Sequence, residues 1–438
     1  MFLSMTMERN PEVVSAALDL HRSGSIGPNT FVLDIDRIIE NAGVIAEAAR
    51  DNGLLLYVMT KQVGRNPFMA RAAAEGGIPT AVAVDTSEAQ QLHRYGVPVG
   101  HVGHLVQIPS RDIAAVLSMR PEVVTVFTVE EAEAVARVAR AVGVEQDLLL
   151  RILEPNDFRY PGQEGGFPIA ALPAAVQGIA ALDGVRVVGL TAFPCLLFDY
   201  ASRQVQPASN LTSLIRAANL LRRDLSVDVR QVNAPSITCA ATMGLLRASG
   251  ATHGEPGSAL TGNTPLHAVS AQPERPAMVY VSEVAGVDGD LAYCFGGGFY
   301  ARSRAARALL ATPAGDRLMA EFLPLPPDAI DYYASLHLQA GVRAHVGDSV
   351  LFAFRSQVFV SRSRVVAVGG IARDNAAVLG VCDAMGNVLD KDGYPLGARE
   401  ARVFVDRIWD RYIAGWRRSQ DKRQQEENQY PSGGEALA

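Results

Sequence analysis

The stretch Leu54-Leu55-Leu56-Tyr57-Val58-Met59-Thr60-Lys61 sets the pattern of this chain, because six apolar residues run without a charge until a lysine follows them. A short run that is apolar at every position is typical of a strand buried on both faces of a parallel sheet. Parallel neighbours need a crossover, usually a helix, before the next strand. We therefore expect residues 54–59 to be one strand of a repeating strand–helix array.

Similar apolar runs recur along the chain, and amphipathic segments such as residues 36–51 and 128–142 separate them. This alternation predicts a (β/α)8 barrel over residues 30–272, with an open doubly wound sheet as the alternative. The expected strands are residues 30–33, 54–59, 80–84, 101–105, 123–127, 147–153, 185–190, 228–232 and 251–254.

A second domain is expected at residues 273–418, because the pattern changes after Pro273-Glu274-Arg275-Pro276. Alternating and β-branched runs with Gly-containing turns then indicate an antiparallel, mostly β domain. Residues 402–418 predict a terminal helix. Residues 1–29 are set apart as an N-terminal segment, and residues 419–438 are expected to be a flexible tail.

Composition excludes several classes of function. The chain carries 40 basic and 46 acidic residues, a net charge of −6, so it lacks the basic footprint of a nucleic-acid binder. Charges interrupt its beginning before any signal-like apolar run, and no long uncharged apolar segment follows. Its four cysteines are widely spaced, without a metal-binding pattern. We expect a cytoplasmic protein that binds neither nucleic acid nor membrane and holds no metal.

Lysine is scarce, since only Lys61, Lys391 and Lys422 occur among the 40 basic residues. Lys391 lies in a turn and Lys422 in the polar tail, where a solvated charge is a sufficient explanation. Lys61 instead follows a buried strand, at the end of a barrel where functional groups gather. Apolar surroundings lower a lysine pKa and make its amine available as a nucleophile, so Lys61 is a candidate Schiff-base residue.

The loop Thr252-His253-Gly254-Glu255-Pro256-Gly257-Ser258 follows the last expected barrel strand. Its glycines allow a ligand to approach the backbone, and the amides of Gly257 and Ser258 suit a phosphate. The carboxylate of Glu255 suits a heterocyclic nitrogen. Together with Lys61, this loop predicts a site for pyridoxal 5'-phosphate.

The order of these features resembles the alanine-racemase-like, fold-type III pyridoxal phosphate proteins, closest to their YhfX-like branch. The matching segments are residues 34–41, the strand before Lys61, Asn233-Ala234-Pro235-Ser236 and Glu255-Pro256-Gly257. The resemblance implies that Lys61 forms the internal aldimine and Glu255 faces the pyridine nitrogen. It further implies phosphate contacts from Asn233, Ser236, Gly257 and Ser258.

Two more cofactor contacts follow from the resemblance. In the family, a histidine packs on the cofactor, and its position falls near Phe193, so the resemblance implies that an aromatic ring packs there instead. The family's arginine that contacts the cofactor phenolate has Arg159 as its candidate here. Alanine racemase places an arginine at the pyridine nitrogen, whereas Glu255 is the choice of the family's decarboxylases. Those enzymes follow Glu-Pro-Gly with an arginine, which Ser258 replaces here.

A racemase needs acid–base groups on both faces of the substrate Cα. Lys61 supplies one group, and the family takes the other from the β domain of a partner subunit. The segment 292–300 offers Tyr293 and Cys294 as the favoured candidates, with Tyr300 beside them. A homodimer is therefore expected.

We interpret the chain as a pyridoxal phosphate enzyme that acts at the Cα of an amino acid, as a racemase through Lys61. The alternatives are a pyridoxal phosphate decarboxylase, a barrel aldolase that uses Lys61 without the cofactor, and a non-catalytic carrier of the cofactor. His101, His104 and His253 are weaker candidates, for which a structural role is expected.

Overall fold

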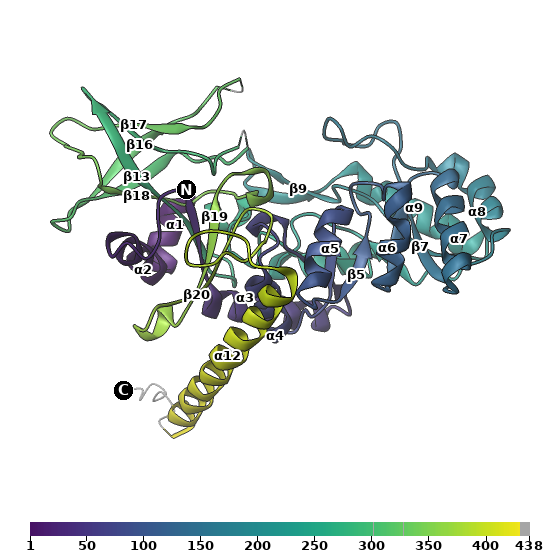
Figure 1. Ribbon diagram of the computed structural model, residues 1–438. Coiled ribbons are helices and arrows are strands. Elements are labelled where there is room, and N and C mark those ends of the chain that lie inside the picture. Colours follow the sequence, from purple (N-terminus) through teal and green to yellow (C-terminus); the bar gives the residue numbers. More distant parts are fainter. Residues whose placement is uncertain (301, 327, 430–438) are drawn as a thin grey trace, which may run out of the picture.

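The computed structural model describes residues 1–300, 302–326 and 328–429. Two nine-stranded sheets dominate it, one parallel and one mainly antiparallel. Figure 1 shows the parallel sheet with its helices on one side of the molecule and the antiparallel sheet on the other. Among the described helices, none has a stretch long and apolar enough to cross a bilayer.

The parallel sheet closes into the expected (β/α)8 barrel. Its order is β2-β12-β11-β8-β7-β6-β5-β4-β3, and its two end strands, β2 (Leu55–Leu56) and β3 (Val58–Met59), are halves of one extended segment. The closure pairs Leu55 with His253 and Val58 with Ala81. The remaining strands are β4 (Ala81–Ala83), β5 (Val99–Val102), β6 (Val123–Val126), β7 (Gln146–Arg151), β8 (Val185–Thr191), β11 (Gln231–Asn233) and β12 (His253–Gly254).

Helices surround the barrel, and polar side chains fix where several of them begin. Asp34, Asn66, Asp85 and Thr128 each accept a hydrogen bond from a first-turn amide of the following helix. The barrel helices are α3 (Ile35–Asp51), α4 (Pro67–Glu75), α5 (Thr86–Arg94), α6 (Ile113–Ser118), α7 (Val129–Val142), α8 (Leu172–Ala180), α9 (Ser209–Arg223) and α10 (Met243–Ser249). Short 3₁₀ turns are η2 (Ser110–Asp112), η3 (Ile169–Ala171) and η4 (Ala240–Thr242).

The second sheet forms the β domain, in the order β14-β17-β16-β15-β18-β13-β1-β19-β20, with a further β14–β13 pairing that closes part of it. Its strands are β13 (Met278–Asp288), β14 (Leu291–Phe295), β15 (Arg307–Ala311), β16 (Arg317–Leu323), β17 (Tyr333–His337), β18 (Ser349–Phe352), β19 (Arg364–Gly369) and β20 (Ala377–Cys382). The smaller elements are the β9 (Leu196–Asp199) and β10 (Gln204–Pro207) hairpin, α11 (Pro265–Val269), η5 (Val358–Val360) and η6 (Ile371–Arg373).

The first strand, β1 (Thr30–Asp34), corrects the expected start of the barrel at residue 30. It lies in the β domain, antiparallel to β13 and parallel to β19, with Val32 opposite Val279 and Val366. All five of its residues are buried, so its pattern suits either sheet and does not specify a partner. The crossing from the β domain into the barrel therefore falls between Asp34 and Ile35.

The N-terminal helices, α1 (Phe2–Arg9) and α2 (Pro11–Arg22), also belong with the β domain. Val13, Val14 and Leu18 pack in one buried cluster with strand residues such as Val279 and Leu351. The segment 1–29, which the sequence pattern assigned to neither domain, thus forms a layer that covers this sheet.

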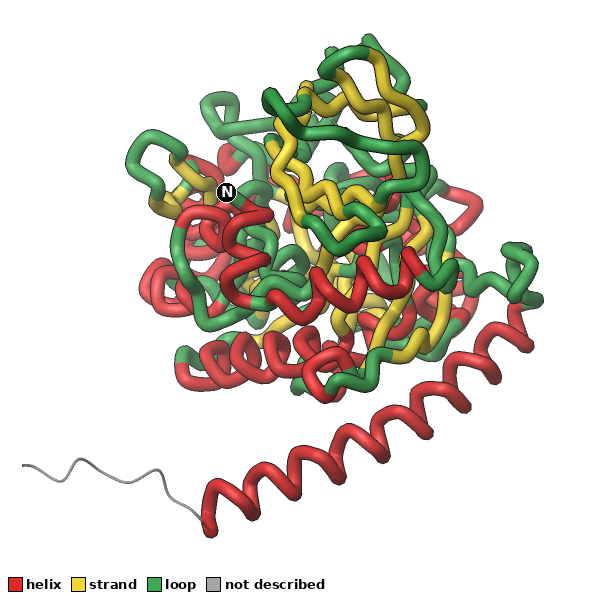
Figure 2. Tube along the Cα trace, turned by 90° about the vertical axis from the view of Figure 1, so that its left-hand side faces the viewer, coloured by secondary structure: helices red, strands yellow, loops and turns green. Residues whose placement is uncertain are grey.

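The terminal helix α12 (Ala398–Gln429) is longer than the expected residues 402–418. Val405 and Trp409 are buried near its start, and Arg417 binds Glu75 on α4 at 2.6 Å. Beyond this contact the helix runs away from the body of the molecule, as Figure 2 shows. The expected tail at 419–438 is therefore helical up to Gln429, and its last nine residues lie outside the described part of the chain.

Candidate active site

A cavity of about 240 Å³ lies at the carboxyl ends of the barrel strands and is walled on one side by the β domain. This end of a barrel is where catalytic groups are found in (β/α)8 enzymes. The cavity brings together most of the candidates from the sequence, namely Lys61, Phe193, Ser236, Glu255, Gly257 and Ser258. Four different βα segments supply them.

Lys61 begins the 3₁₀ turn η1 (Lys61–Val63), two residues after β3 ends. It is partly accessible from the cavity and otherwise enclosed by protein. Burial lowers the pKa of its ammonium group, while Glu88 and Glu255 oppose the shift. Its Nζ lies 5.9 Å from the centre of the Phe359 ring. A lysine in these surroundings yields the neutral amine more readily than one in water.

Glu255 follows β12 and lies at the floor of the cavity. Its Oε1 accepts a hydrogen bond of 2.7 Å from Asn233 and lies 3.0 Å from Nδ1 of His101, while Nε2 of His104 lies 3.2 Å from Oε2. Burial opposes ionisation of Glu255, but His104, His101 and Asn233 together lower its pKa to about 2. Burial also lowers the pKa of His104 to about 3, despite the attraction of Glu255. At neutral pH Glu255 is therefore a carboxylate.

One oxygen of this carboxylate is left for a ligand. Oε2 of Glu255 is buried and has no hydrogen-bond partner among the described residues, since His104 is close but not aligned. The other nitrogen of His101 is occupied by Thr125 at 2.6 Å, which fixes the ring. An ionised oxygen without a donor, at the wall of a cavity, is a strong acceptor for a ligand N–H.

His101 and His104 are the residues for which sequence reasoning expected only a structural role. Both are buried, on β5 and just after it, and both lie beside Glu255, which is 154 and 151 positions away along the chain. With Glu255 they also form a set of donor atoms within 4.8 Å of one another. The spacing of three residues between the two histidines, at the end of a strand, was the signal in the sequence that they act together. This spacing does not reveal that their common partner is Glu255.

The loops that end at Ser236 and Gly257 leave backbone open to the cavity. A Cβ at Gly257 would lie 2.7 Å from the side-chain amide of Gln62, so a larger residue there would displace it. Ser236 and Ile237 adopt left-handed backbone, with φ of 97° and 46°, and the hydroxyl of Ser236 donates to the carbonyl of Leu196. Such loops present amides toward a bound anion.

For Asn233 the resemblance implies a contact with the phosphate. It ends β11, is fully buried, and donates to Glu255, so it belongs to the floor of the cavity. The structure places the side chain of Asn233 against Glu255 and outside the lining of the cavity, so a phosphate contact of Asn233 stays a prediction.

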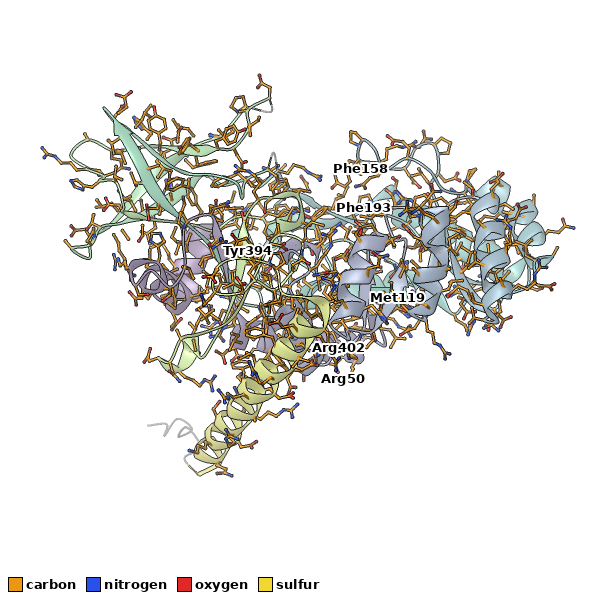
Figure 3. The ribbon with its side chains drawn as sticks, viewed as in Figure 1. Arg50, Met119, Phe158, Phe193, Tyr394 and Arg402 are labelled. Atoms are coloured by element: carbon orange, nitrogen blue, oxygen red, sulfur yellow. The ribbon has the colours of Figure 1, made fainter. Side chains whose placement is uncertain are left out.

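Phe193 lines the cavity as expected for a ring beside a cofactor. It meets His104 edge to face at 5.6 Å between ring centres, and Tyr160 at 6.1 Å. Figure 3 places Phe193 between the barrel helices and the β domain, with Phe158 close to it in that view. Phe193 and Tyr160 thus give the cavity an aromatic wall that suits a planar ligand.

Arg159 does not line the cavity, and its guanidinium donates to the carbonyls of Glu154 and Pro155. The arginine at the end of the fifth strand is Arg151, which the sequence analysis missed. It is fully buried, stacks 4.7 Å from the centre of the Phe127 ring, and donates to the carbonyl of Gln163. Burial lowers the pKa of Arg151 to about 10, and its Nε and Nη1 have no partner among the described residues.

The favoured second acid–base candidates, Tyr293 and Cys294, lie on β14 and do not line the cavity of their own chain. Cys294 is fully buried, its Sγ faces the carbonyl of Ala334, and burial raises the pKa of the thiol to about 12, so a role for it as an acid–base group stays a prediction. A role for Tyr293 in the cavity of a partner stays a prediction. Tyr300, the lesser candidate, lines the cavity, and its buried hydroxyl has no partner among the described residues.

Two family models match this chain. The model for the alanine racemase N-terminal domain matches residues 33–265, and the model for the YhfX-like C-terminal domain matches residues 279–378. The chain is 42% identical over 390 residues to the "Uncharacterized protein YhfX" of Escherichia coli (strain K12), which covers 89% of this chain and 100% of that protein.

Several solved structures share the fold. D-threonine aldolase from Filomicrobium marinum has a TM-score of 0.60 at 17% identity over 82% of this chain and 95% of its own. D-threo-3-hydroxyaspartate dehydratase from Delftia sp. HT23 has a TM-score of 0.60 at 16% identity, over 81% and 97%. Alanine racemase from Clostridium difficile 630 has a TM-score of 0.57 at 14% identity, over 81% and 98%. The chain therefore belongs to the alanine-racemase-like family, in its YhfX-like branch.

Proposed function

We propose that this protein is a pyridoxal 5'-phosphate enzyme that acts at the Cα of an amino acid, as a racemase. The observation that carries the proposal is the pairing, in one cavity, of the lysine Lys61 with the ionised carboxylate Glu255. The family comparison supports it, because an aldolase, a dehydratase and a racemase of amino acids are named among proteins with this fold.

The residues of the cavity fit this cofactor. Lys61 offers the primary amine that an aldehyde needs, and the unpaired Oε2 of Glu255 can accept a hydrogen bond from the ring nitrogen. Gly257, where a Cβ would meet Gln62, keeps the loop open for a phosphate, and Phe193 supplies an aromatic wall. Bound there, pyridoxal phosphate would supply an electron sink for charge that develops at the substrate Cα.

The chain's own groups supply the proton chemistry. Lys61 Nζ has a lowered pKa, so it can take a proton from Cα on one face and return it. Tyr300 enters from the β domain, and burial keeps its pKa raised, although Arg355 and Arg302 oppose this, so its hydroxyl is a proton donor at neutral pH. Glu255 holds a negative charge at the floor of the site. Phe193 and Tyr160 limit the access of water.

The test is exchange of the α-proton with deuterated water, followed by chiral analysis of the product. Exchange with inversion of configuration supports the racemase. Exchange without inversion would mean that only one face carries a working acid–base group, and the racemase proposal would then be abandoned.

A second candidate, an amino-acid decarboxylase, is favoured by one observation, the carboxylate of Glu255 at the cavity floor. The replacement of the following arginine by Ser258 opposes it. Release of carbon dioxide distinguishes the two reactions. The cofactor-free aldolase is distinguished by the visible absorbance of the purified protein, since only the pyridoxal phosphate enzyme is yellow. A mere carrier of the cofactor would have no use for the cavity wall formed by the β domain.

We also propose a homodimer, because the family resemblance takes residues of one β domain to the cavity of the other subunit. Sedimentation of the cofactor-loaded protein tests this. A fully active monomer would show that Tyr300 of the same chain is sufficient, and Tyr293 would have no part in the reaction.

A further inference from the structure

The wall that the β domain contributes to the cavity is basic. Arg302 and Arg355 both line it, together with Lys61 from the barrel, whereas Glu255 is the one acidic residue among the described lining residues. Its Oε1 already lies in hydrogen-bond distance of His101 and Asn233. The cavity therefore has an excess of positive charge that its own residues do not balance.

Neither arginine is paired with a carboxylate in the part of the chain that the structure describes. Among the described residues, no carboxylate oxygen lies within 4.0 Å of the guanidinium of Arg302 or Arg355, although a neighbour such as Arg362 pairs with Asp331 at 3.4 Å. Two unpaired guanidinium groups that face one cavity repel each other, and an anionic ligand relieves that repulsion.

The two arginines lie on neighbouring segments, since the amide of Arg355 donates a hydrogen bond of 3.1 Å to the carbonyl of Ser303, and their side chains have different surroundings. Arg355 precedes Ser356, whose hydroxyl donates at 2.9 Å to the carbonyl of Gln62, so Arg355 is held beside the segment that carries Lys61. Arg302 is exposed and stacks with its guanidinium 4.5 Å from the centre of the Tyr160 ring. Arg355 is thus held near the segment of the reacting amine, whereas Arg302 is the arginine that solvent reaches.

We infer that the substrate is an amino acid with a second acidic group on its side chain, a conclusion that rests on the proposed function. Arg355 binds the α-carboxylate next to the reacting Cα, and Arg302 binds the side-chain acid at the mouth of the cavity. A side-chain carboxylate and a phosphate monoester share the chemistry that a guanidinium recognises. A neutral amino acid would offer Arg302 no anion.

The first experiment compares acidic amino acids with neutral counterparts of similar shape, in both enantiomers, by α-proton exchange in deuterated water. The pairs are aspartate with asparagine, glutamate with glutamine, and phosphoserine with serine. The acidic member is expected to exchange faster by about tenfold or more. The pair with the largest ratio distinguishes a carboxylate from a phosphate side chain. Equal rates within all three pairs would overturn the inference.

The second experiment measures binding without turnover, by calorimetry with succinate, butyrate and methyl phosphate on the purified protein loaded with its cofactor. Succinate is expected to bind at least about tenfold more tightly than butyrate. Arg302→Gln should abolish that preference, while Arg355→Gln should weaken both ligands. The control is Arg304→Gln, because this exposed arginine stacks 3.8 Å from the Tyr200 ring centre and does not line the cavity.

The outcomes separate this inference from the proposed function. If the cofactor is bound to Lys61 but succinate shows no preference over butyrate, only the inference fails. If Arg302→Gln lowers the retention of cofactor and leaves the succinate preference intact, the arginine binds the cofactor phosphate, and the inference is overturned. If no cofactor is bound, the proposed function fails by itself.

Discussion

Two buried glutamates in this protein face histidines, and they differ in what surrounds them. Glu255 lies 3.0 Å from His101, and Glu274 lies 3.3 Å from His267. In both cases burial opposes ionisation, and the neighbouring groups nevertheless lower the pKa of the carboxyl group. Their local chemistry is therefore nearly the same.

The difference is that protein encloses Glu274 completely, whereas Glu255 borders a cavity. Oε1 of Glu274 accepts a hydrogen bond of 2.7 Å from the amide of Ala240, and its backbone carbonyl accepts one from Arg9. These contacts join η4, the N-terminal helix α1 and the start of the β domain. The comparison teaches that a carboxylate–imidazole pair alone does not indicate catalysis, and that an adjoining cavity with a nucleophile does.

The largest expected effect concerns the nucleophile that distinguishes the two sites. Lys61→Ala should abolish both activity and the covalent attachment of the cofactor, because Lys391 and Lys422 lie far along the chain and outside the barrel. The measurement is peptide mapping after borohydride reduction of the yellow protein.

Lys391→Ala is the control for this change, since Lys391 is exposed and pairs with Asp392. It should keep full labelling at Lys61. A reduced cofactor found on Lys391 or Lys422 would contradict the assignment and remove the reason for treating the Glu255 cavity as the active site.

The next effect in size is that of Glu255→Gln, which keeps the shape of the side chain and removes its charge. A charge-assisted hydrogen bond to the ring nitrogen is stronger than a neutral one. We expect the cofactor to remain bound while α-proton exchange slows by about 10²-fold or more, on the order of 3 kcal/mol of lost transition-state stabilisation. Glu274→Gln should leave the exchange rate per folded molecule unchanged. If Glu255→Gln and Glu274→Gln slowed the exchange equally, the cavity beside Glu255 would not distinguish the two glutamates.

The sequence was sufficient for the barrel and for the meeting of Lys61 and Glu255 at one end of it, because both depend on local patterns. Continuous apolar runs separated by amphipathic helices specify parallel strands, and Lys61 and Glu255 each follow such a run. Ends of parallel strands meet at one edge of the barrel, so residues at those ends come together without further information.

The other predictions failed for one of two reasons. Either the deciding contact lies far along the chain, or the end of a strand was placed at the wrong residue. β1 is apolar enough for either sheet, and only pairing with residues about 250 and 330 positions later decides its place. Arg151 was missed because the expected strand ran to residue 153, so the arginine at its end was sought later, at Arg159. The partner of His101 is Glu255, far along the chain, which no spacing reveals.

The third prediction concerns stability at the enclosed site. Glu274→Gln should lower the free energy of unfolding by about 1–3 kcal/mol, because it weakens hydrogen bonds of a buried group that has no solvent to replace them. Chemical denaturation at pH 7 measures this. Glu47→Gln, on the exposed face of α3, is the matched control and should have little effect. A Glu274→Gln protein as stable as the wild type would mean that the pair with His267 contributes nothing.

The smallest expected effect is the change of that stability difference with pH. The pKa of Glu274 is lower in the folded protein than its ordinary value of 4.5, so the unfolded chain binds more protons as the pH falls through that value. The stability that the ionised carboxylate provides is therefore complete above pH 4.5 and is lost progressively below it.

Glutamine does not titrate, so the unfolding curves of the wild type and Glu274→Gln should approach each other as the pH is lowered from 5 toward 3. A difference between wild type and Glu274→Gln that grows on acidification would show that Glu274 is protonated in the folded protein, and the likeness between the two glutamate–histidine pairs would then be lost.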